Sequence, residues 1–274
     1  MEDELPRLWG SLSLSEVECD ELEIRNQTWE VGAHQGKTCV VGKLIADHLV
    51  SKEVIRNTLL CGWKPSIMPD FKVLGDNLFL VDFASEQDKQ RVLEVRPRVF
   101  EGNLFAIEDF DGLMASSKYL FDKATFCVRM HNLPLACMSL AMGQQIGAAM
   151  GKVEEVDVDN GGMGWGESLR VKITLDLHKP LMRGRMLKIN GSAVLVGFQY
   201  EKLPKFCLNC GVLKHGVTGC VVRIGTRKQN ATPKFGPWLR APSLKLVLGG
   251  RMGQKEDQRD IPHRDNSMGK RDPG

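Results

Sequence analysis

Four side chains near position 210 have the types and the spacing of a metal site. Cys207, Cys210, His215 and Cys220 form a C-x2-C-x4-H-x4-C pattern within fourteen residues. Three thiolates and one imidazole fill the tetrahedral shell of Zn²⁺, with Zn–S near ~2.3 Å and Zn–N near ~2.0 Å, and leave no position for water. The pattern therefore predicts a structural zinc knuckle, whose short loop takes its folding free energy from the metal. The alternative is a set of redox-active or inert thiols.

Cations and apolar side chains lie close to this pattern in the sequence. A folded knuckle displays an apolar platform and a few cations, which is how short zinc modules bind single-stranded nucleic acid. Ordinary solvation is the alternative interpretation of the lysines. Leu208 follows the first Cys, where an aromatic residue is usual, so we expect modest affinity. The candidate contacts with RNA or single-stranded DNA are Lys205, Phe206, Lys214, Arg223, Arg227, Lys228, Trp238 and Arg240.

The charge of the chain is unevenly distributed. The net charge is +3, but residues 1–30 carry nine acidic and two basic side chains, whereas residues 221–274 carry twelve Lys and Arg against five Asp and Glu. A basic arm beside a folded unit attracts polyphosphate, because each neutralised phosphate releases condensed counterions. The alternative is a solvated tail, and the segment from Gly249 has the composition of a disordered one.

Length and composition limit the class of protein. With 274 residues, 42% of them hydrophobic, we expect two or three modest units and not a large multidomain enzyme. No apolar run approaches the roughly 20 residues that a membrane-spanning helix needs. The acidic start is not a secretory signal, so we expect an intracellular, reducing compartment, with nucleus and cytoplasm not distinguished. Clustered cysteines in such a chain indicate metal, not disulfides.

The first part of the chain predicts an α+β fold. Its pattern implies helices on one face of a mainly antiparallel sheet, as in ferredoxin-like or RNA-recognition-motif (RRM-like) folds. Val54, Ile55 and Leu59 are expected on the buried face of the first helix, and Ser85 is expected to cap the second. The predicted elements are strands at 38–45 and 77–83, helices at 51–60 and from Ser85 to before Pro97, a hairpin at 98–107 turning near Gly102, and a further strand around 67–74.

The sheet of this first unit lacks the usual RNA-stacking rings. Leu78 and Leu80 stand where an RRM presents two exposed aromatics, and Val40 stands at the equivalent place on the first strand. The neighbouring Phe79, Val81 and Phe83 are expected in the core. We therefore predict that this unit serves as a scaffold, in self-association or in binding a protein partner, and not as an RNA reader.

A second α+β unit is predicted after a linker. A helix at 138–150 has Met138, Met142, Ile146 and Met150 on one face and ends at a Gly151 cap. Periodicity does not decide whether its strands join the first sheet. GGMGWG at 161–166 lies between two strands, so we interpret it as a flexible hairpin loop and not a phosphate site. The predicted strands are 124–133, 152–159, 169–175 and a hairpin turning at Asn190-Gly191.

Several segments together resemble a known family. They are LSLSEVE after the acidic start, the strand-helix unit from Thr38, KPLMRGRML at 179–187, YEKLPKFCLNCG at 200–211 and FGPWLRA at 235–241. Residues 1–245 resemble plant proteins in which a domain of unknown function precedes a CCHC knuckle, products related to the first open reading frame of LINE-type non-LTR retrotransposons. The resemblance implies zinc-dependent nucleic-acid binding, with RNA packaging or chaperoning, and no known catalytic activity. Lys214 stands where the family commonly has glycine before the His.

The sequence contains no catalytic constellation. A zinc deaminase needs H-x-E with P-C-x-x-C, but no His here is followed by such a Glu and Phe206 precedes Cys207. We therefore predict a non-enzymatic, zinc-dependent binder of RNA or single-stranded DNA, with no membrane role; the alternative is a protein-interaction adaptor with a purely structural knuckle. The predicted units are an acidic segment 1–30, an RRM-like domain 31–112, a second α+β unit 124–203, the knuckle 204–222 and a basic, largely disordered tail 223–274.

Overall fold

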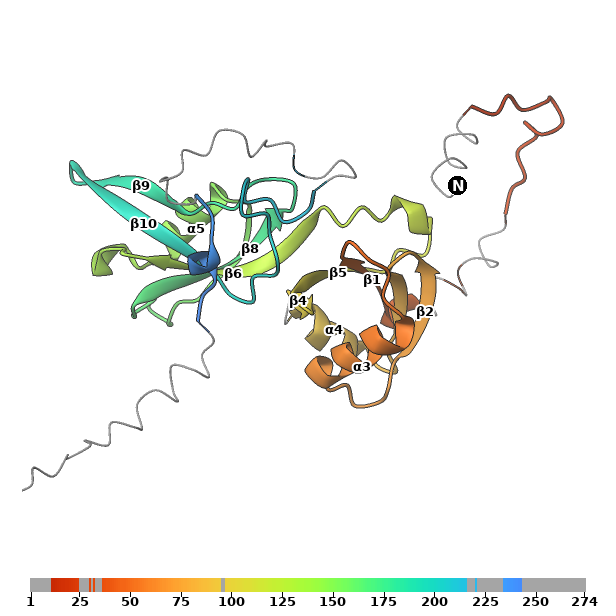
Figure 1. The fold of residues 1–274 in the computed structure, drawn as a ribbon, viewed down its shortest axis with the longest axis horizontal. Coiled ribbons are helices and arrows are strands. Elements are labelled where there is room, and N and C mark those ends of the chain that lie inside the picture. The colour runs from red at the N-terminus through yellow and green to blue at the C-terminus, as the bar shows by residue number, and fades with distance from the viewer. Residues whose placement is uncertain are drawn as a thin grey trace, which may run out of the picture. The chain divides into compact units, whose positions relative to one another are not determined.

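The computed structural model describes two antiparallel sheets of five strands each, both accompanied by helices (Figure 1). Its described residues are 11–24, 30, 32, 36–94, 97–215, 220 and 234–242. The predicted α+β class is confirmed, and the second unit builds its own sheet. Among the described residues, no helix is long and apolar enough to cross a membrane.

The first sheet has the strand order β2-β3-β1-β5-β4. All predicted elements are present, including the strand expected around 67–74. Ser85 caps α4, since its Oγ accepts a hydrogen bond from the backbone N–H of Asp88 at 3.2 Å. The elements are β1 (Cys39–Ile45), α3 (Lys52–Trp63), β2 (Asp70–Gly75), β3 (Leu78–Asp82), α4 (Glu86–Glu94), β4 (Arg98–Phe100) and β5 (Asn103–Asp109).

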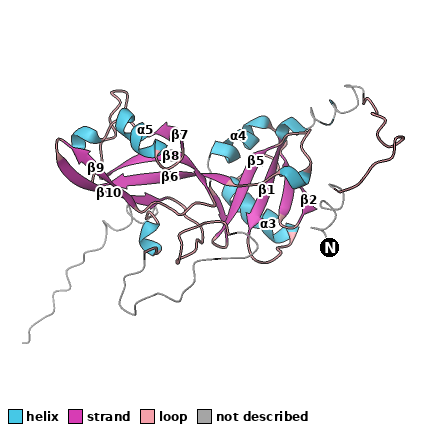
Figure 2. Cartoon of the chain, turned by 90° about the horizontal axis from the view of Figure 1, so that it is seen from above, coloured by secondary structure: helices cyan, strands magenta, loops and turns pink. Residues whose placement is uncertain are grey.

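Helices α3 and α4 cover one face of this sheet (Figure 1; Figure 2 gives the view from above). Ile55, Leu59 and Trp63 recur at every fourth position of α3 and are buried against the strands. The prediction for Val54 was wrong, because it lies one position off this stripe and is 47% exposed. Phe79, Val81 and Phe83 lie in this core as predicted.

The opposite face of the first sheet is also buried. Val41 lies on this face, where it is paired with Leu80. Val40 faces the helices instead, so the prediction for Val40 was wrong by one residue. Val41 and Leu78 belong to one apolar cluster with Tyr119 and Phe121 of the segment that follows β5. The backbone N–H of Phe121 donates to the Glu108 carboxylate at 3.1 Å. The surface on which an RRM stacks bases is therefore aliphatic and packed.

The second sheet repeats the strand order of the first, as β7-β8-β6-β10-β9. Asn190 and Gly191 form the predicted hairpin turn, with φ of 47° and 83°. Alternate residues of β8 are buried, as the sequence pattern predicts. The elements are β6 (Lys123–His131), α5 (Leu140–Ala148), β7 (Lys152–Val156), β8 (Ser168–Asp176), β9 (Gly184–Ile189) and β10 (Ser192–Tyr200).

Helix α5 is shorter than predicted at both ends. Met138 precedes it and is buried, while Ser139 is the N-cap and accepts a hydrogen bond from the Met142 N–H. Gly151 was wrongly predicted as the C-terminal cap, since Ala149 is the cap residue and the φ of Gly151 is not positive. A Cβ there would lie 2.2 Å from the Thr174 carbonyl oxygen, so glycine is needed for close backbone approach.

The two units differ in the connection before their last hairpin. The first unit forms α4 between β3 and β4, whereas residues 177–183 between β8 and β9 contain no helix. The carbonyl oxygen of Leu177 and the N–H of Leu181 are instead hydrogen-bonded to the segment carrying the Cys/His pattern. This segment therefore completes the second unit.

Candidate metal centre

The four predicted ligands converge. One ligand atom from each of Cys207, Cys210, His215 and Cys220 lies within 4.8 Å of all the others. The Cys210 Sγ and the His215 Nε2 are 3.6 Å apart. Tetrahedral Zn²⁺ with bonds of roughly 2.3 Å to sulfur and 2.0 Å to nitrogen requires such a separation, about 3.5 Å. The donor set and its spacing thus fit a closed four-coordinate site.

Backbone hydrogen bonds shape the loop around the first two cysteines. The N–H of Gly211 donates to the Cys207 carbonyl at 2.7 Å, and the N–H of Cys207 donates to the Val212 carbonyl at 2.9 Å. Gly211 has a φ of +78°, a conformation that favours glycine. A Cβ at this position would also lie 2.2 Å from the Phe235 ring. Gly211 thus permits the tight turn directly after the second cysteine.

The loop favours one thiolate before any metal binds. Burial opposes ionisation of Cys207, but the backbone N–H groups of Cys210 and Asn209 and the His215 imidazole outweigh it and lower the pKa of Cys207 to about 6. Burial and the neighbouring thiols raise the pKa of Cys210 to about 11. Because metal ligation requires thiolates, ionisation costs less at Cys207 than at Cys210, where a bound cation would favour the thiolate.

The loop is fixed to the second unit by main-chain contacts. The N–H of Leu181 donates to the Gly211 carbonyl and that of Lys214 donates to the Leu177 carbonyl, both at 2.9 Å. Pro180 and Val212 form an antiparallel bridge between these hydrogen bonds. The candidate metal centre therefore shares hydrogen bonds with the chain leaving β8 and is part of the second unit.

Lys214, a predicted nucleic-acid contact, is engaged within the chain. Its Nζ lies 2.8 Å from the Asp122 carboxylate and 2.6 Å from the Leu120 carbonyl oxygen. This places its ammonium group at the start of β6. A glycine at this position would lack this contact.

Two further predicted contacts pack on each other. The Arg240 guanidinium carbon lies 5.6 Å from the centroid of the Phe206 ring, and its nitrogens donate to the carbonyls of Leu203 and Pro204. Trp238, from the same segment, is 51% exposed and its carbonyl accepts a hydrogen bond from the Gln199 side chain. FGPWLRA is thus anchored on the second unit and still presents an indole ring to solvent.

Of the remaining predicted contacts, one lies on the surface and three lie outside the described residues. Lys205 is exposed, next to the half-buried Phe206. Arg223, Arg227 and Lys228 lie outside the described residues, as does most of the segment predicted to form a disordered tail.

Sequence reasoning missed a cationic surface on the β9–β10 hairpin. Arg183, Arg185 and Lys188 are exposed there. Between residues 177 and 255 the chain has fifteen Lys and Arg and one carboxylate, that of Glu201. This nearly complete absence of acids, visible in the sequence, is the signal that identifies the surface.

The one carboxylate of this region is neutralised. The Glu201 side chain is 16% exposed and binds the Arg129 Nε at 2.9 Å and the Arg170 Nε at 3.1 Å. Burial opposes its ionisation, but the hydrogen bonds from Arg170 and Arg129 lower the pKa of Glu201. Arg170 also pairs with Asp157 at 3.5 Å, so two arginines and two carboxylates balance each other on the face of the second sheet opposite its core.

The GGMGWG loop is tied to α5. The Gly162 carbonyl accepts the N–H of Leu140 at the start of that helix, at 3.0 Å. The Asp159 carboxylate accepts the N–H groups of Gly161 and Met163. The N–H of Leu140, at the helix end where a phosphate would bind, is thus already hydrogen-bonded to the loop. The arrangement agrees with a hairpin loop and not with a phosphate cradle.

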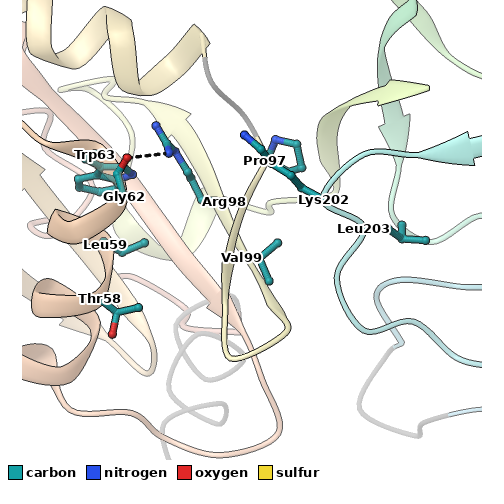
Figure 3. A pocket seen from close by; sticks show the side chains of 9 residues that line it. All are labelled: Thr58, Leu59, Gly62, Trp63, Pro97, Arg98, Val99, Lys202 and Leu203. Carbon is teal, nitrogen blue, oxygen red and sulfur yellow. Dashed lines mark hydrogen bonds between the residues drawn. The ribbon is translucent and has the colours of Figure 1, made fainter. Parts of the chain in front are cut away.

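A cavity of about 390 Å³ lies at the end of α3 (Figure 3). Arg98 donates to the Gly62 carbonyl at 3.4 Å, and burial lowers its pKa. The Nε of Arg98 and the Nε1 of Trp63 have no hydrogen-bond partner among the described residues. Carbonyls at a helix C-terminus attract cations and repel anions, so we interpret Arg98 as a helix-end contact. The cavity is lined by Thr58, Leu59, Gly62, Trp63, Pro97, Arg98, Val99, Lys202 and Leu203.

Two protein-family models match parts of the chain. Residues 32–114 match a domain of unknown function, DUF4283, and residues 175–222 match a zinc knuckle. The knuckle match begins within β8, well before Cys207, which agrees with the contacts that join the loop to the chain leaving this strand. The search of curated proteins found no match.

Several solved structures align weakly with this chain. The N-terminal three RNA-binding domains of the yeast splicing factor Prp24 align with 12% identity over 61% of this chain and 66% of that chain, with a TM-score of 0.25. The C. elegans NONO-1 homodimer aligns with 11% identity over 84% and 76%, with a TM-score of 0.24. A Sxl-lethal protein–RNA complex aligns with 16% identity over 59% and 98%, with a TM-score of 0.22. Likenesses this weak say nothing about function.

Proposed function

We propose that this protein binds single-stranded nucleic acid, RNA or DNA, through its second unit, and that Zn²⁺ held by the Cys/His cluster keeps that unit folded. The proposal rests on the charge of residues 177–255, which contain fifteen Lys and Arg and one carboxylate, itself paired with arginines. Phosphate neutralisation by such a segment releases counterions and supplies affinity. The function is binding, without a catalytic step.

The exposed ring of Trp238 favours binding of single strands over binding of duplexes. A base in a single strand is free to stack on an indole, whereas a base inside a helix is not. Trp238 follows Lys234 by four residues, so a stacking surface and a phosphate partner are close together. We also propose descent from a plant LINE-type retroelement, since the two matched families occur in the order that the resemblance implies.

Salt titration tests the proposal. Binding of labelled single-stranded RNA and DNA is measured by fluorescence anisotropy, and the affinity is expected to fall by a factor of roughly 10³ or more between about 50 and 200 mM salt. The Cys210→Ser variant, with one ligand fewer, is expected to lose both zinc and binding. A flat salt response, or binding that is independent of zinc, would contradict the proposal.

A protein-interaction adaptor is the second candidate, and the edge of the first sheet favours it. Strand β2 is an edge strand on which Val73 is 60% exposed, and Ile67 and Met68 before it are 63% and 66% exposed. An exposed apolar edge is a template for pairing with another chain. Absence of nucleic-acid binding, together with concentration-dependent self-association that Val73→Lys abolishes, would favour the adaptor.

A further inference from the structure

A cavity that the proposed function does not involve lies beside the β9–β10 hairpin. Its volume is about 530 Å³, within the range of small-molecule pockets, roughly 300–1,000 Å³. It is bounded by the chain leading into β9, by the outward face of β10 and by the Phe235 ring. All of these elements belong to the second unit.

The floor of the cavity is apolar and open. Leu195 and Gly197 are two positions apart on β10 and so lie on one face of the strand, while Val196 between them is buried in the core. Leu195 is 57% exposed, although it is a large aliphatic side chain. A Cβ on Gly197 would meet no heavy atom within 4 Å, which shows empty space directly above the strand.

The rim of the cavity is aromatic and cationic. The Arg183 guanidinium carbon lies 5.6 Å from the centroid of the Phe235 ring. Arg183, which lines the cavity, and Lys234, next to Phe235 in the chain, are both exposed, and the one carboxylate between residues 177 and 255, that of Glu201, is held by two arginines. A flat apolar group with negative charge attached to it therefore fits this cavity better than a neutral or cationic ligand.

We propose that the cavity binds one unstacked nucleobase of a single strand, with Arg183 and Lys234 holding the phosphates on either side. The inference rests on the proposed function and deepens it, because it names the base as well as the backbone as the ligand. Base recognition adds a sequence-tolerant contact to the electrostatic one, since every base has an apolar face.

The Gly197→Leu variant tests this inference. Glycine here lies in strand β10 without a positive φ, and a Cβ meets no heavy atom within 4 Å, so a leucine side chain can enter the cavity from the strand. Two single-stranded probes of equal length are compared, one with bases and one abasic. The wild type is expected to bind the base-containing probe about 5-fold or more tightly than the abasic one, and Gly197→Leu is expected to remove this preference while its affinity for the abasic probe is unchanged.

The control is Gly166→Leu, at an exposed loop glycine where a Cβ meets nothing closer than 3.9 Å. Thermal unfolding verifies that both variants fold, and Arg183→Gln serves as a second variant, expected to weaken binding of both probes. Wild-type protein that binds both probes equally would overturn the base pocket and leave the proposed function standing. Wild-type protein that binds neither would overturn both, and equal competition by polyglutamate would assign the cavity to an acidic peptide instead.

Discussion

The Lys214 ammonium lies 2.8 Å from the carboxylate of Asp122, ninety-two residues earlier in the chain. Lys214 stands directly before the His ligand of the candidate metal centre, and Asp122 stands directly before β6. The pair therefore joins the metal-binding loop to the first strand of the second sheet. The hydrogen bond from Lys214, followed by that from His178, lowers the pKa of Asp122.

Lys214 is expected to contribute more to stability than to nucleic-acid affinity. Lys214→Met removes the contacts with Asp122 and with the Leu120 carbonyl, and we expect a loss of about 1 kcal/mol in the free energy of unfolding, because both partners are partly exposed. Denaturant titration of the zinc-loaded protein measures this loss. Lys188→Met, at an exposed position of the hairpin, is the matched control, expected to weaken binding at unchanged stability. The reverse pattern would assign Lys214 to the nucleic-acid interface.

Metal removal is expected to loosen the whole second unit. Structural zinc contributes about 10–16 kcal/mol in small zinc-finger peptides, as much as the total stability of a typical domain. Chelation by EDTA, or Cys210→Ser, is expected to expose the amide of Leu181 to hydrogen exchange, because its acceptor is the Gly211 carbonyl. Amides of β1 and β3 serve as the internal control. Protection at Leu181 that survives zinc loss, measured with elemental analysis of the same sample, would show that the loop folds without metal.

The elements that the sequence predicts correctly are those with a local signal. Leu169, Val171 and Ile173 alternate with polar residues, and β8 follows with the same alternation. The four metal ligands lie within fourteen residues, so their spacing alone identifies the site. Cys39, Val40 and Val41 are all buried, so β1 is apolar on both faces and its pattern does not tell which face each residue occupies. This ambiguity explains the error at Val40.

The parts that the sequence does not predict depend on contacts between distant segments. In the sequence, Lys214 has the surroundings of a solvated lysine, and only the fold shows that Asp122 lies beside it. The base pocket combines Arg183, Gly197 and Phe235 from three segments, none of which has a distinctive local pattern. Gly151 lies where a helix cap is usual, and only its approach to Thr174 of β8 reveals another reason for glycine.

One face of the first sheet is packed, so we expect that aromatic substitutions there do not create a surface for stacking RNA bases. Leu78→Tyr places a larger side chain at a position that is 8% exposed, so we expect a loss of about 1–3 kcal/mol in the free energy of unfolding and no gain in RNA affinity. Val73→Tyr on the exposed edge strand β2 is the matched control and is expected to be nearly neutral. Calorimetry measures the stability, and fluorescence anisotropy measures the RNA affinity. A Leu78→Tyr variant that is stable and binds RNA more tightly would show that this face is accessible.

The cluster of Glu201 with Arg129 and Arg170 predicts how stability depends on pH. The folded state lowers the pKa of Glu201, so the unfolded chain takes up its proton first as the pH falls. The stabilisation is therefore complete above the ordinary Glu pKa, near 4.3, and is lost as the pH falls through the lower folded value. Glu201→Gln is expected to cost about 2 kcal/mol at pH 7, because Arg129 and Arg170 both lose this carboxylate and Arg170 keeps only its longer contact with Asp157, at 3.5 Å.

Thermal unfolding of both proteins across pH tests this expectation, because metal ligation contributes equally to the two. Their difference in stability is expected to be constant from neutral pH down to about pH 5 and to shrink below about pH 4. Lys152→Gln provides the control, since Lys152 pairs with Glu154 on an exposed part of β7 and should change little at any pH. A difference between wild type and Glu201→Gln that stays constant into strong acid would mean that the pKa of Glu201 is the same in the folded and unfolded states, so that the arginines do not stabilise its carboxylate.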